Sequence, residues 1–318
     1  MKIKSTGKII DQFYVLGSPD VPVFLLDAPT PALFDAGFTA LAKLYERDIR
    51  KFLHDRVPGY LFLTHAHYDH IGAARYFKDT WPKLKIVGSD KAQEILSRPG
   101  AIQSMKALNQ EAAQVGPSFG ATHTDEFEPF ELDLIMSPGQ TIQLGPNLSV
   151  KAISTPGHTW DLMSYWIPEM KILIASDAVG NEDDAGYITS EFLVDYDSYC
   201  NSLELLSRLN SQVLCAGHRL VVTGSDVMKY FRRCFEHTRE YVAMVEEFLE
   251  HEGGSITETV ARIKAIEWDP KPWPKQPEMA YLLNTTAKVQ NIQRRAQNAT
   301  RKTGILKDRE EAHSRKCG

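Results

Sequence analysis

The stretch LFLTHAHYDHIGA, residues 61–73, places three histidines and an aspartate within six positions, directly after an apolar run. In an extended loop, side chains at i and i+2 point to the same side, so His65 and His67 can face one point. Asp69 and His70 stand at the turn into the next predicted helix and can face a neighbouring point. Neutral imidazole and carboxylate groups are ligands of zinc, iron and manganese. This division predicts two adjacent metal sites rather than one.

Two adjacent metals need further ligands, because a pair bridged by one carboxylate takes about seven ligands in total. The chain must therefore supply about three more from distant loops. It has three candidates, each placed after a predicted strand and beside a glycine or small residue that lets the backbone turn: His158, Asp177 and His218. We predict two divalent metal ions, zinc foremost, with iron or manganese as alternatives that the same ligands accept. The predicted ligands are His65, His67, Asp69, His70, His158, Asp177 and His218.

The first 224 residues alternate strand and helix patterns, which is typical of stacked α/β layers. The predicted strands are 9–16, 22–27, 32–35, 60–64, 84–88, 130–135, 141–144, 148–154, 162–167, 171–176 and 212–216. The predicted helices are 38–53, 71–77 and 197–209, together with an inserted pair at 90–98 and 101–115. Turns are expected at Gly145-Pro146 and Pro168-Glu169.

After residue 224 the pattern becomes helical. Helices are predicted at 225–251, 256–267 and near 278–297. Ser255 and Glu258 fit a capping box that opens the second of them. The predicted organisation is a catalytic domain over 1–224 with a helical insertion at about 90–116, a helical lid or extension over 225–300, and a charged, flexible tail over 301–318.

Composition indicates which kinds of partner and which cellular compartment to expect. The formal net charge of −5 provides no basic surface for a polyanion, so no nucleic-acid partner is expected. The four cysteines contain no C-x-x-C pair, which suits a reducing compartment better than a disulfide framework. The N-terminus lacks the apolar core of a signal peptide, and no stretch reaches the roughly 18–20 apolar residues of a membrane span. We expect a cytoplasmic protein with no membrane partner.

The motifs THAHYDH, PGH, SD and GH occur in this order within about residues 9–224, and this pattern resembles the metallo-β-lactamase superfamily. The resemblance implies a four-layer αββα sandwich, of mixed α and β class, with the site at the edge where the strands end. It also implies that His65, His67 and His158 bind one metal. By the same resemblance, Asp69, His70 and His218 would bind the second metal, and Asp177 would bridge the two.

Within that superfamily, the sequence is similar to the thioesterase-like branch that includes the quinolone signal response protein. The similarity rests on LTHAHYDHIG, on MKALNQEAA in the helical insertion, and on the helices that follow the last histidine. It implies a dinuclear hydrolase in which a metal-bridging hydroxide, formed because two metals lower the pKa of water from about 15.7 toward 7, attacks an acyl carbon. Asp69 is the expected catalytic residue, orienting the hydroxide or carrying a proton to the leaving group.

The expected substrate is a small acyl compound, a thioester of the acyl-coenzyme A kind or another carboxylic ester. The C-terminal helices would cover it, or would form a homodimer interface. Alternatives are a lactonase or phosphodiesterase of the same fold and a regulatory protein whose partner contacts matter more than turnover. An iron-dependent oxidoreductase is the weakest alternative, because oxygen reductases on this fold commonly have glutamate where His67 stands. Structural capping is the expected role of Thr64, Asp161 and Ser176, which neighbour predicted ligands.

Overall fold

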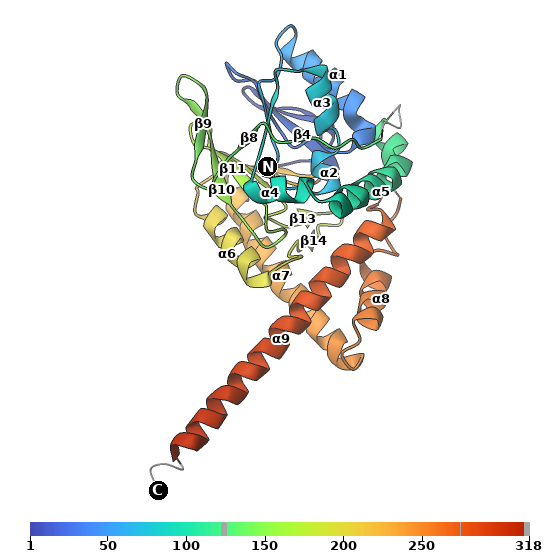
Figure 1. Cartoon of the computed structure of the whole chain (residues 1–318), viewed down its shortest axis with the longest axis vertical. Helices are drawn as coiled ribbons and strands as arrows, with labels where there is room; N and C mark the ends of the chain where they lie inside the picture. The colour runs from blue at the N-terminus through green and yellow to red at the C-terminus, as the bar shows by residue number, and fades with distance from the viewer. Residues whose placement is uncertain (122–125, 274, 315–318) are drawn as a thin grey trace.

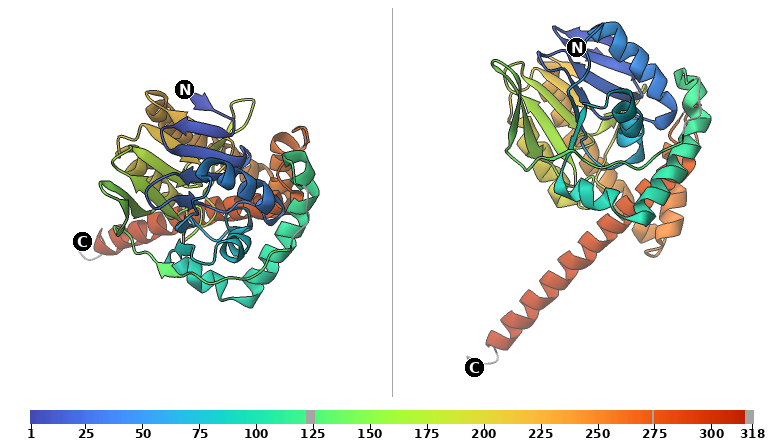
Figure 2. Two further views of the ribbon diagram at one scale, coloured as in Figure 1. Left: turned by 90° about the horizontal axis from the view of Figure 1, so that it is seen from above. Right: turned by 45° about the horizontal axis from the view of Figure 1, so that its top comes forward.

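Two seven-stranded sheets lie face to face, and helices cover the outer face of each (Figures 1 and 2). The structure, a computed structural model, describes residues 1–121, 126–273 and 275–314, and for 299–314 the backbone alone. The arrangement confirms the predicted mixed α/β fold with four layers.

The N-terminal sheet has the order β2-β3-β4-β5-β6-β7-β8. Its strands are β2 Gly7–Ile10, β3 Phe13–Ser18, β4 Val21–Leu26, β5 Ala32–Phe34, β6 Tyr60–Phe62, β7 Lys85–Gly88 and β8 Leu134–Ile135. The pairings are antiparallel from β2 to β5 and parallel from β5 to β8. The single strand predicted at 9–16 is wrong, because the chain turns at Gln12, with φ 62°, and β2 and β3 form a hairpin. No glycine or proline marks that turn in the sequence.

The second sheet has the order β1-β16-β15-β12-β11-β10-β9. Its strands are β1 Lys2–Ile3, β9 Thr141–Gly145, β10 Leu148–Ser154, β11 Met163–Ile167, β12 Ile172–Ser176, β15 Val213–Ala216 and β16 Val221–Thr223. The turns expected at Gly145-Pro146 and Pro168-Glu169 join antiparallel pairs, as predicted. A separate ribbon pairs β13 Asn181–Glu182 with β14 Ile188–Thr189.

Helices alternate with the strands and then dominate the C-terminal part. They are η1 Thr39–Leu41, α1 Ala42–Leu53, α2 Tyr68–Ile71, α3 Ala74–Thr80, α4 Asp90–Leu96, α5 Pro99–Val115, η2 Gly116–Phe119, α6 Tyr196–Ser207, α7 Asp226–His251, α8 Ile256–Glu267 and α9 Glu278–Ser314. Across the described residues, none of these helices combines the length and the apolar character that crossing a bilayer requires.

Apolar side chains form three clusters, which correspond to the three interfaces between four layers. Between the sheets, Phe34, Phe62 and Tyr165 pack with ring centroids 5.2–5.9 Å apart. A second cluster lies between the N-terminal sheet and α1, α3 and α5, and a third lies between the other sheet and α6 and α7. Burial on both faces explains why strands such as β12 and β15 are almost entirely apolar and buried along their whole length.

Helix α9 is longer than the sequence predicts. Figure 1 shows it projecting away from the sheets toward the C-terminus. It continues to Ser314, so the tail expected to be flexible over 301–318 is helical over 301–314, and 315–318 lie outside the described residues. The stretch from 298 to 314 contains no proline and is rich in lysine, arginine, glutamate and alanine, which favour helix.

The Ser255 side-chain cap at the start of α8 leads to a first prediction, and it is the one half of the predicted capping box that forms, because the Ser255 backbone N–H donates to the Glu252 carbonyl. Ser255 Oγ accepts a hydrogen bond from the Glu258 backbone N–H at 3.3 Å. We expect Ser255→Ala to lower the free energy of unfolding by about 1 kcal/mol, because a first-turn N–H loses its acceptor. Ser104→Ala, on the exposed middle of α5, is the matched control and should be neutral or slightly stabilising in urea denaturation. Equal effects of the two substitutions would contradict the capping role.

Candidate metal centre

The first four predicted ligands occupy the connection between β6 and α2. His67 has extended backbone angles, φ −81° and ψ 147°, and α2 begins at the next residue. The imidazole rings of His65 and His67 therefore lie side by side in an edge-to-face arrangement, with centroids 4.6 Å apart and ring planes inclined by 69°. Asp69 and His70 lie on the first turn of α2. The local geometry inferred from the i, i+2 spacing is present in the structure.

The three distant residues converge on the same sheet edge. His158 follows β10, Asp177 directly follows β12, and His218 follows β15. The seven side chains form two groups, and within each group the candidate ligand atoms lie within 4.8 Å of one another. One group contains His65, His67, His158 and Asp177, and the other contains Asp69, His70 and His218.

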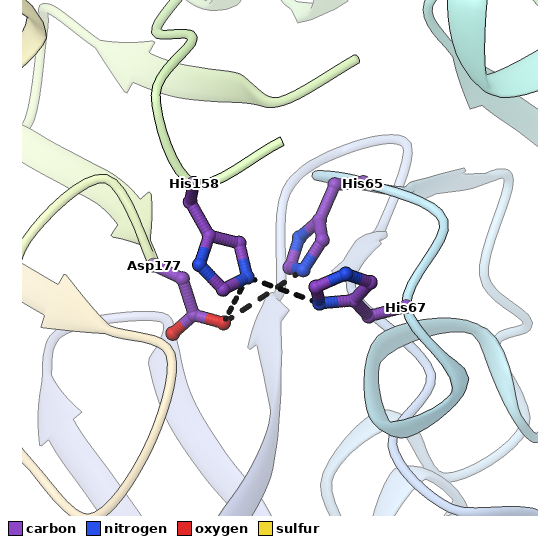
Figure 3. Close-up of side chains that lie close together, drawn as sticks. All are labelled: His65, His67, His158 and Asp177. Atoms are coloured by element: carbon purple, nitrogen blue, oxygen red, sulfur yellow. Dashed lines mark hydrogen bonds and ion pairs between the residues drawn. The ribbon is translucent and has the colours of Figure 1, made fainter. Parts of the chain in front are cut away.

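The Oδ2 atom of Asp177 stands between the two groups (Figure 3 shows the first). It is 3.7 Å from His65 Nε2 and 3.4 Å from His158 Nε2, both in the first group. It is also 3.2 Å from His70 Nε2 and 3.9 Å from His218 Nε2, both in the second. A single carboxylate oxygen thus reaches imidazoles of both groups, as a bridging ligand must.

The other oxygen of Asp177 is held away from the cluster. Its Oδ1 accepts a hydrogen bond from Asn181 Nδ2 at 2.9 Å. Gly217 makes room for it, because a Cβ at that position would lie 2.1 Å from Asp177 Oδ1. The Oδ1 contact leaves Oδ2 directed at the imidazoles, and sequence reasoning did not identify Asn181.

Outer contacts set which nitrogen of each histidine faces the cluster. His158 Nδ1 lies 2.7 Å from the Glu191 carbonyl oxygen, and His218 Nδ1 lies 2.7 Å from the Asp20 carbonyl oxygen. A carbonyl only accepts, so each Nδ1 carries the proton and each Nε2 presents its lone pair to the cluster. These are the tautomers that a metal site requires.

Asp35 orients His70 in the same way, by accepting a hydrogen bond from its Nδ1. It is 3% exposed, directly follows β5, and its Oδ2 accepts a hydrogen bond from His70 Nδ1 at 2.8 Å. Its carboxylate also accepts from the backbone N–H and the hydroxyl of Thr64. Sequence reasoning missed Asp35, although it shares the signal that identified Asp177: an aspartate directly after a buried strand.

Thr64 and Ser176 do more than the capping expected of them. Thr64 Oγ1 lies 3.1 Å from His65 Nδ1 and 3.0 Å from Ser176 Oγ, and Ser176 Oγ lies 3.5 Å from His70 Nδ1. Asp161 accepts from the Ala66 backbone N–H at 2.7 Å and so holds the loop between His65 and His67.

The protonation preferences of the cluster fit a cation. Burial and the neighbouring imidazoles hold the pKa of His65 well below its ordinary value, and burial and His158 lower the pKa of His67 to about 3. Both rings are therefore neutral, which is the ligating form. The Nε2 atoms of His65 and His70 are buried without a hydrogen-bond partner among the described residues. Buried polar atoms left in this way are expected where a metal ion completes the site.

The carboxylates of the cluster favour positive charge. Burial alone would raise the pKa of Asp177, but His158, His218 and His70 together hold it well below its usual range. Burial alone would likewise lower the pKa of His70, but Asp35 and Asp177 raise it well above its ordinary value. The donor set and its charge together fit divalent cations held by nitrogen and oxygen ligands.

The outer carboxylate leads to a second prediction. We expect Asp35→Asn to weaken zinc affinity by about 10–100-fold, because the amide cannot accept from all three donors that Asp35 now serves. Competition with a chromophoric chelator would measure this. Asp195→Asn is the matched control, because Asp195 caps α6 through Ser198 N, where asparagine caps equally well. Unchanged zinc affinity in Asp35→Asn would contradict the orienting role.

The cluster opens into a cavity of about 440 Å³. The cluster contributes His67, Asp69, His158, Asp177 and His218 to its wall. Residues from α8, α9 and the connector between them form another part of the wall: Glu267, Trp268, Lys271, Lys275, Gln276, Pro277, Ala280, Tyr281, Leu283, Asn284, Ala287 and Lys288. The C-terminal helices therefore contribute to the pocket as well as packing against the sheets.

Comparison with known proteins gives a consistent result. A family model described as the metallo-beta-lactamase superfamily matches residues 23–218. A solved structure described as a metallo-beta-lactamase family protein from Thermus thermophilus superposes with a TM-score of 0.64 and 17% identity, covering 91% of this chain and 95% of that one. At this identity the likeness concerns the fold alone.

Two curated relatives match a shorter part of the chain. An uncharacterized protein, YobT, from Bacillus subtilis is 32% identical over 119 residues, which are 37% of this chain and 45% of the relative. A hydroxyacylglutathione hydrolase from Bartonella henselae is 24% identical over 119 residues, which are 37% of this chain and 33% of the relative. The chain thus spans less than half the length of these relatives.

Proposed function

The chain belongs to the metallo-β-lactamase superfamily, and from this membership we propose that it is a dinuclear, metal-dependent hydrolase that cleaves a thioester or another carboxylic ester. The observation that carries the proposal is the meeting of seven residues with nitrogen and oxygen donors, Asp177 among them, at the wall of a cavity of about 440 Å³. A cavity of this size suits a small acyl compound.

Zinc is the proposed cation for both groups of donors, with iron or manganese as alternatives. Bound there, divalent cations supply a water nucleophile at neutral pH and polarise the acyl carbonyl. His65, His67 and His158 would hold one ion, Asp69, His70 and His218 the other, and Asp177 Oδ2 would contact both. No serine or cysteine nucleophile is then required.

Asp69 is the proposed catalytic residue. Its Oδ2 lies 3.5 Å from His218 Nε2, and its side chain lines the cavity and is 15% exposed. A carboxylate that borders both the cluster and the cavity can take a proton from the attacking water and deliver it to the leaving sulfur or oxygen.

The acyl group is proposed to lie against the apolar part of the cavity wall. Phe38, just before η1, and Leu108, on α5, line one part of that wall. Tyr281 and Leu283, on α9, line another. Support for a thioester comes from the relative named hydroxyacylglutathione hydrolase and from the similarity to the branch of the quinolone signal response protein. We also propose that the C-terminal helices close over the bound substrate.

A substrate panel would test the function. The protein would be reconstituted separately with zinc, iron and manganese and given acyl-coenzyme A and acylglutathione thioesters, a lactone and a phosphodiester. We expect thioester hydrolysis at least about tenfold above the other classes in kcat/KM, and a fall in kcat of about 10²-fold or more in Asp69→Asn.

Asp79→Asn is the matched control for that substitution, because Asp79 forms an exposed ion pair with Arg75 and should leave kcat unchanged. Preference for the phosphodiester or the lactone would replace the proposed substrate class. An absence of turnover with every metal, or oxygen consumption with iron, would favour the regulatory or the oxidoreductase alternative.

A further inference from the structure

A buried lysine lines the cavity beside the metal-ligand cluster. Lys288, on α9, is 2% exposed and borders the same cavity as His67 and Asp177. Among the described residues its ammonium has no hydrogen bond and no ion pair, and its recorded contact is with the ring of Tyr241, with Nζ 4.7 Å from the centroid. Because a buried ammonium loses its hydration, lysine is rarely buried without a partner. The cavity is the place from which a partner can come.

A second donor lies one turn earlier on the same face of α9. Asn284 precedes Lys288 by four residues, so the two side chains are neighbours on the helix surface. Asn284 is half-buried and lines the cavity, and within the described residues its amide has no hydrogen bond. An ammonium and an amide N–H₂ side by side are suited to a carboxylate, which accepts at both oxygens.

The other cations of the cavity wall already have partners. Arg219 pairs with Asp20 at 3.0 Å, and Lys271 pairs with Asp183 at 3.2 Å. Lys288 is therefore distinguished from them by its free donors.

Glu191 is a cavity carboxylate near Lys288, and its two oxygens have other neighbours. Its Oε1 accepts from Asn181 Nδ2 at 3.3 Å, and its Oε2 lies 4.0 Å from His158 Nδ1. Lys288 lies close enough for its charge to oppose the rise that burial causes in the pKa of Glu191, but among the described residues the two form neither a hydrogen bond nor an ion pair, so the ammonium keeps its N–H donors for an external anion.

We propose that Lys288 and Asn284 form a subsite for a carboxylate at the end of the acyl group remote from the bond that is cleaved. This inference rests on the proposed function and deepens it, because it names the substrate class as thioesters or esters of dicarboxylic acids. The methylene chain of such an acid would cross the apolar wall near Tyr281. A charge-assisted contact to a buried ammonium discriminates more strongly than the same contact at an exposed surface.

Equilibrium binding tests the subsite without requiring turnover. Zinc-loaded protein would be titrated calorimetrically with dicarboxylates from succinate to suberate and with the monocarboxylates of equal chain length, such as glutarate against pentanoate. Both acids of a pair have one carboxylate that can bind the metals. Only the dicarboxylate has a second carboxylate, which the proposed subsite would bind. We expect the dicarboxylate of best length to bind about tenfold or more tightly, beyond the statistical factor of two.

Variants assign the preference to these residues. Lys288→Met should remove the difference in affinity between a dicarboxylate and the monocarboxylate of equal length, measured with the pair that differs most in the wild type. Lys288→Arg should retain most of that difference. Lys275→Met is the matched control, because Lys275 lines the same cavity but donates to the Trp268 carbonyl at 2.9 Å, and it should keep the preference. If Lys288→Met does not fold, the preference of the wild type for dicarboxylates and a smaller preference in Asn284→Ala still test the subsite. Equal binding of both acids by the wild type, or equal losses in Lys288→Met and Lys275→Met, would overturn the proposal.

Hydrolysis separates this proposal from the one on which it rests. Glutaryl and pentanoyl thioesters of coenzyme A would be compared in kcat/KM. A dicarboxylate preference in binding without cleavage of any thioester or other carboxylic ester of these acids would refute the proposed function and leave the subsite standing. Cleavage of both thioesters at equal kcat/KM would refute the subsite and leave the proposed function standing.

Discussion

Asp177→Asn is expected to abolish stable binding of the metal pair and, with it, hydrolysis. Asp177 Oδ2 lies 3.2–3.9 Å from the Nε2 atoms of His65, His70, His158 and His218, and among the described residues it is the carboxylate oxygen that reaches both donor groups. Asparagine keeps the shape but removes the negative charge and can turn N–H donors toward the cluster. We expect metal affinity to fall by more than about 100-fold, beyond the 10–100-fold typical of an outer contact, and kcat by at least about 10²–10³-fold.

Elemental analysis after equilibrium dialysis would measure the bound metal, and the same preparation would be assayed for turnover. Asp184→Asn is the matched control, because the Asp184 side chain is 89% exposed and forms an ion pair with Lys4 at the surface. It should retain full metal content and activity. Two ions bound with wild-type affinity in Asp177→Asn would refute the bridging role.

Gly157→Ala is expected to have the largest effect on stability. Gly157 immediately precedes His158, has φ +132°, and a Cβ there would lie 2.3 Å from the Tyr199 backbone N and Cα at the start of α6. Its carbonyl also accepts the backbone N–H groups of Leu193, Val194 and Asp195. Backbone atoms cannot move aside as a flexible side chain can, so strain and overpacking add. We expect the free energy of unfolding to fall by roughly 3–5 kcal/mol.

Gly139→Ala separates the cost of backbone strain from the cost of a steric clash with neighbouring atoms. Gly139 also has positive φ, +85°, but nothing lies within 4 Å of a Cβ built there. It should lose only about 1–2 kcal/mol, the cost of the left-handed conformation. Urea denaturation of the metal-free proteins would measure both, and metal titration would show whether His158 is displaced in Gly157→Ala. Equal stability losses would show that the contact with α6 does not constrain the loop.

Much of the fold and of the cluster could be predicted because the signals are local. The i, i+2 spacing of His65 and His67 requires only an extended backbone, and the aspartate after the apolar strand at 172–176 requires only a strand end. The hairpin at Gln12 was missed because no glycine or proline marks its turn. The helical continuation of α9 to Ser314 was missed although the composition of that stretch favours helix.

The contacts that orient the ligands could not be predicted, because they join residues distant in the chain. Asp35 reaches His70 across 35 positions, and the Asp20 carbonyl reaches His218 across 198. Each is an ordinary loop residue in sequence and acquires its part when the strand ends of two sheets meet. Asn181 likewise has no motif, and it holds Asp177 through a short ribbon that periodicity did not reveal.

Residue identity and short-range spacing thus predicted the donor types, the division of the four donors at 65–70 and the layered α/β class. The assignment of His158, Asp177 and His218 to the two groups came from the family resemblance. The tertiary structure alone decided which nitrogen of each ring faces inward, which oxygen of Asp177 is free, and that Lys288 lies in the cavity wall rather than in water. The physical reason is that tautomer, orientation and desolvation depend on the nearest atoms in space. Those atoms are supplied by segments whose separation along the chain carries no local signal.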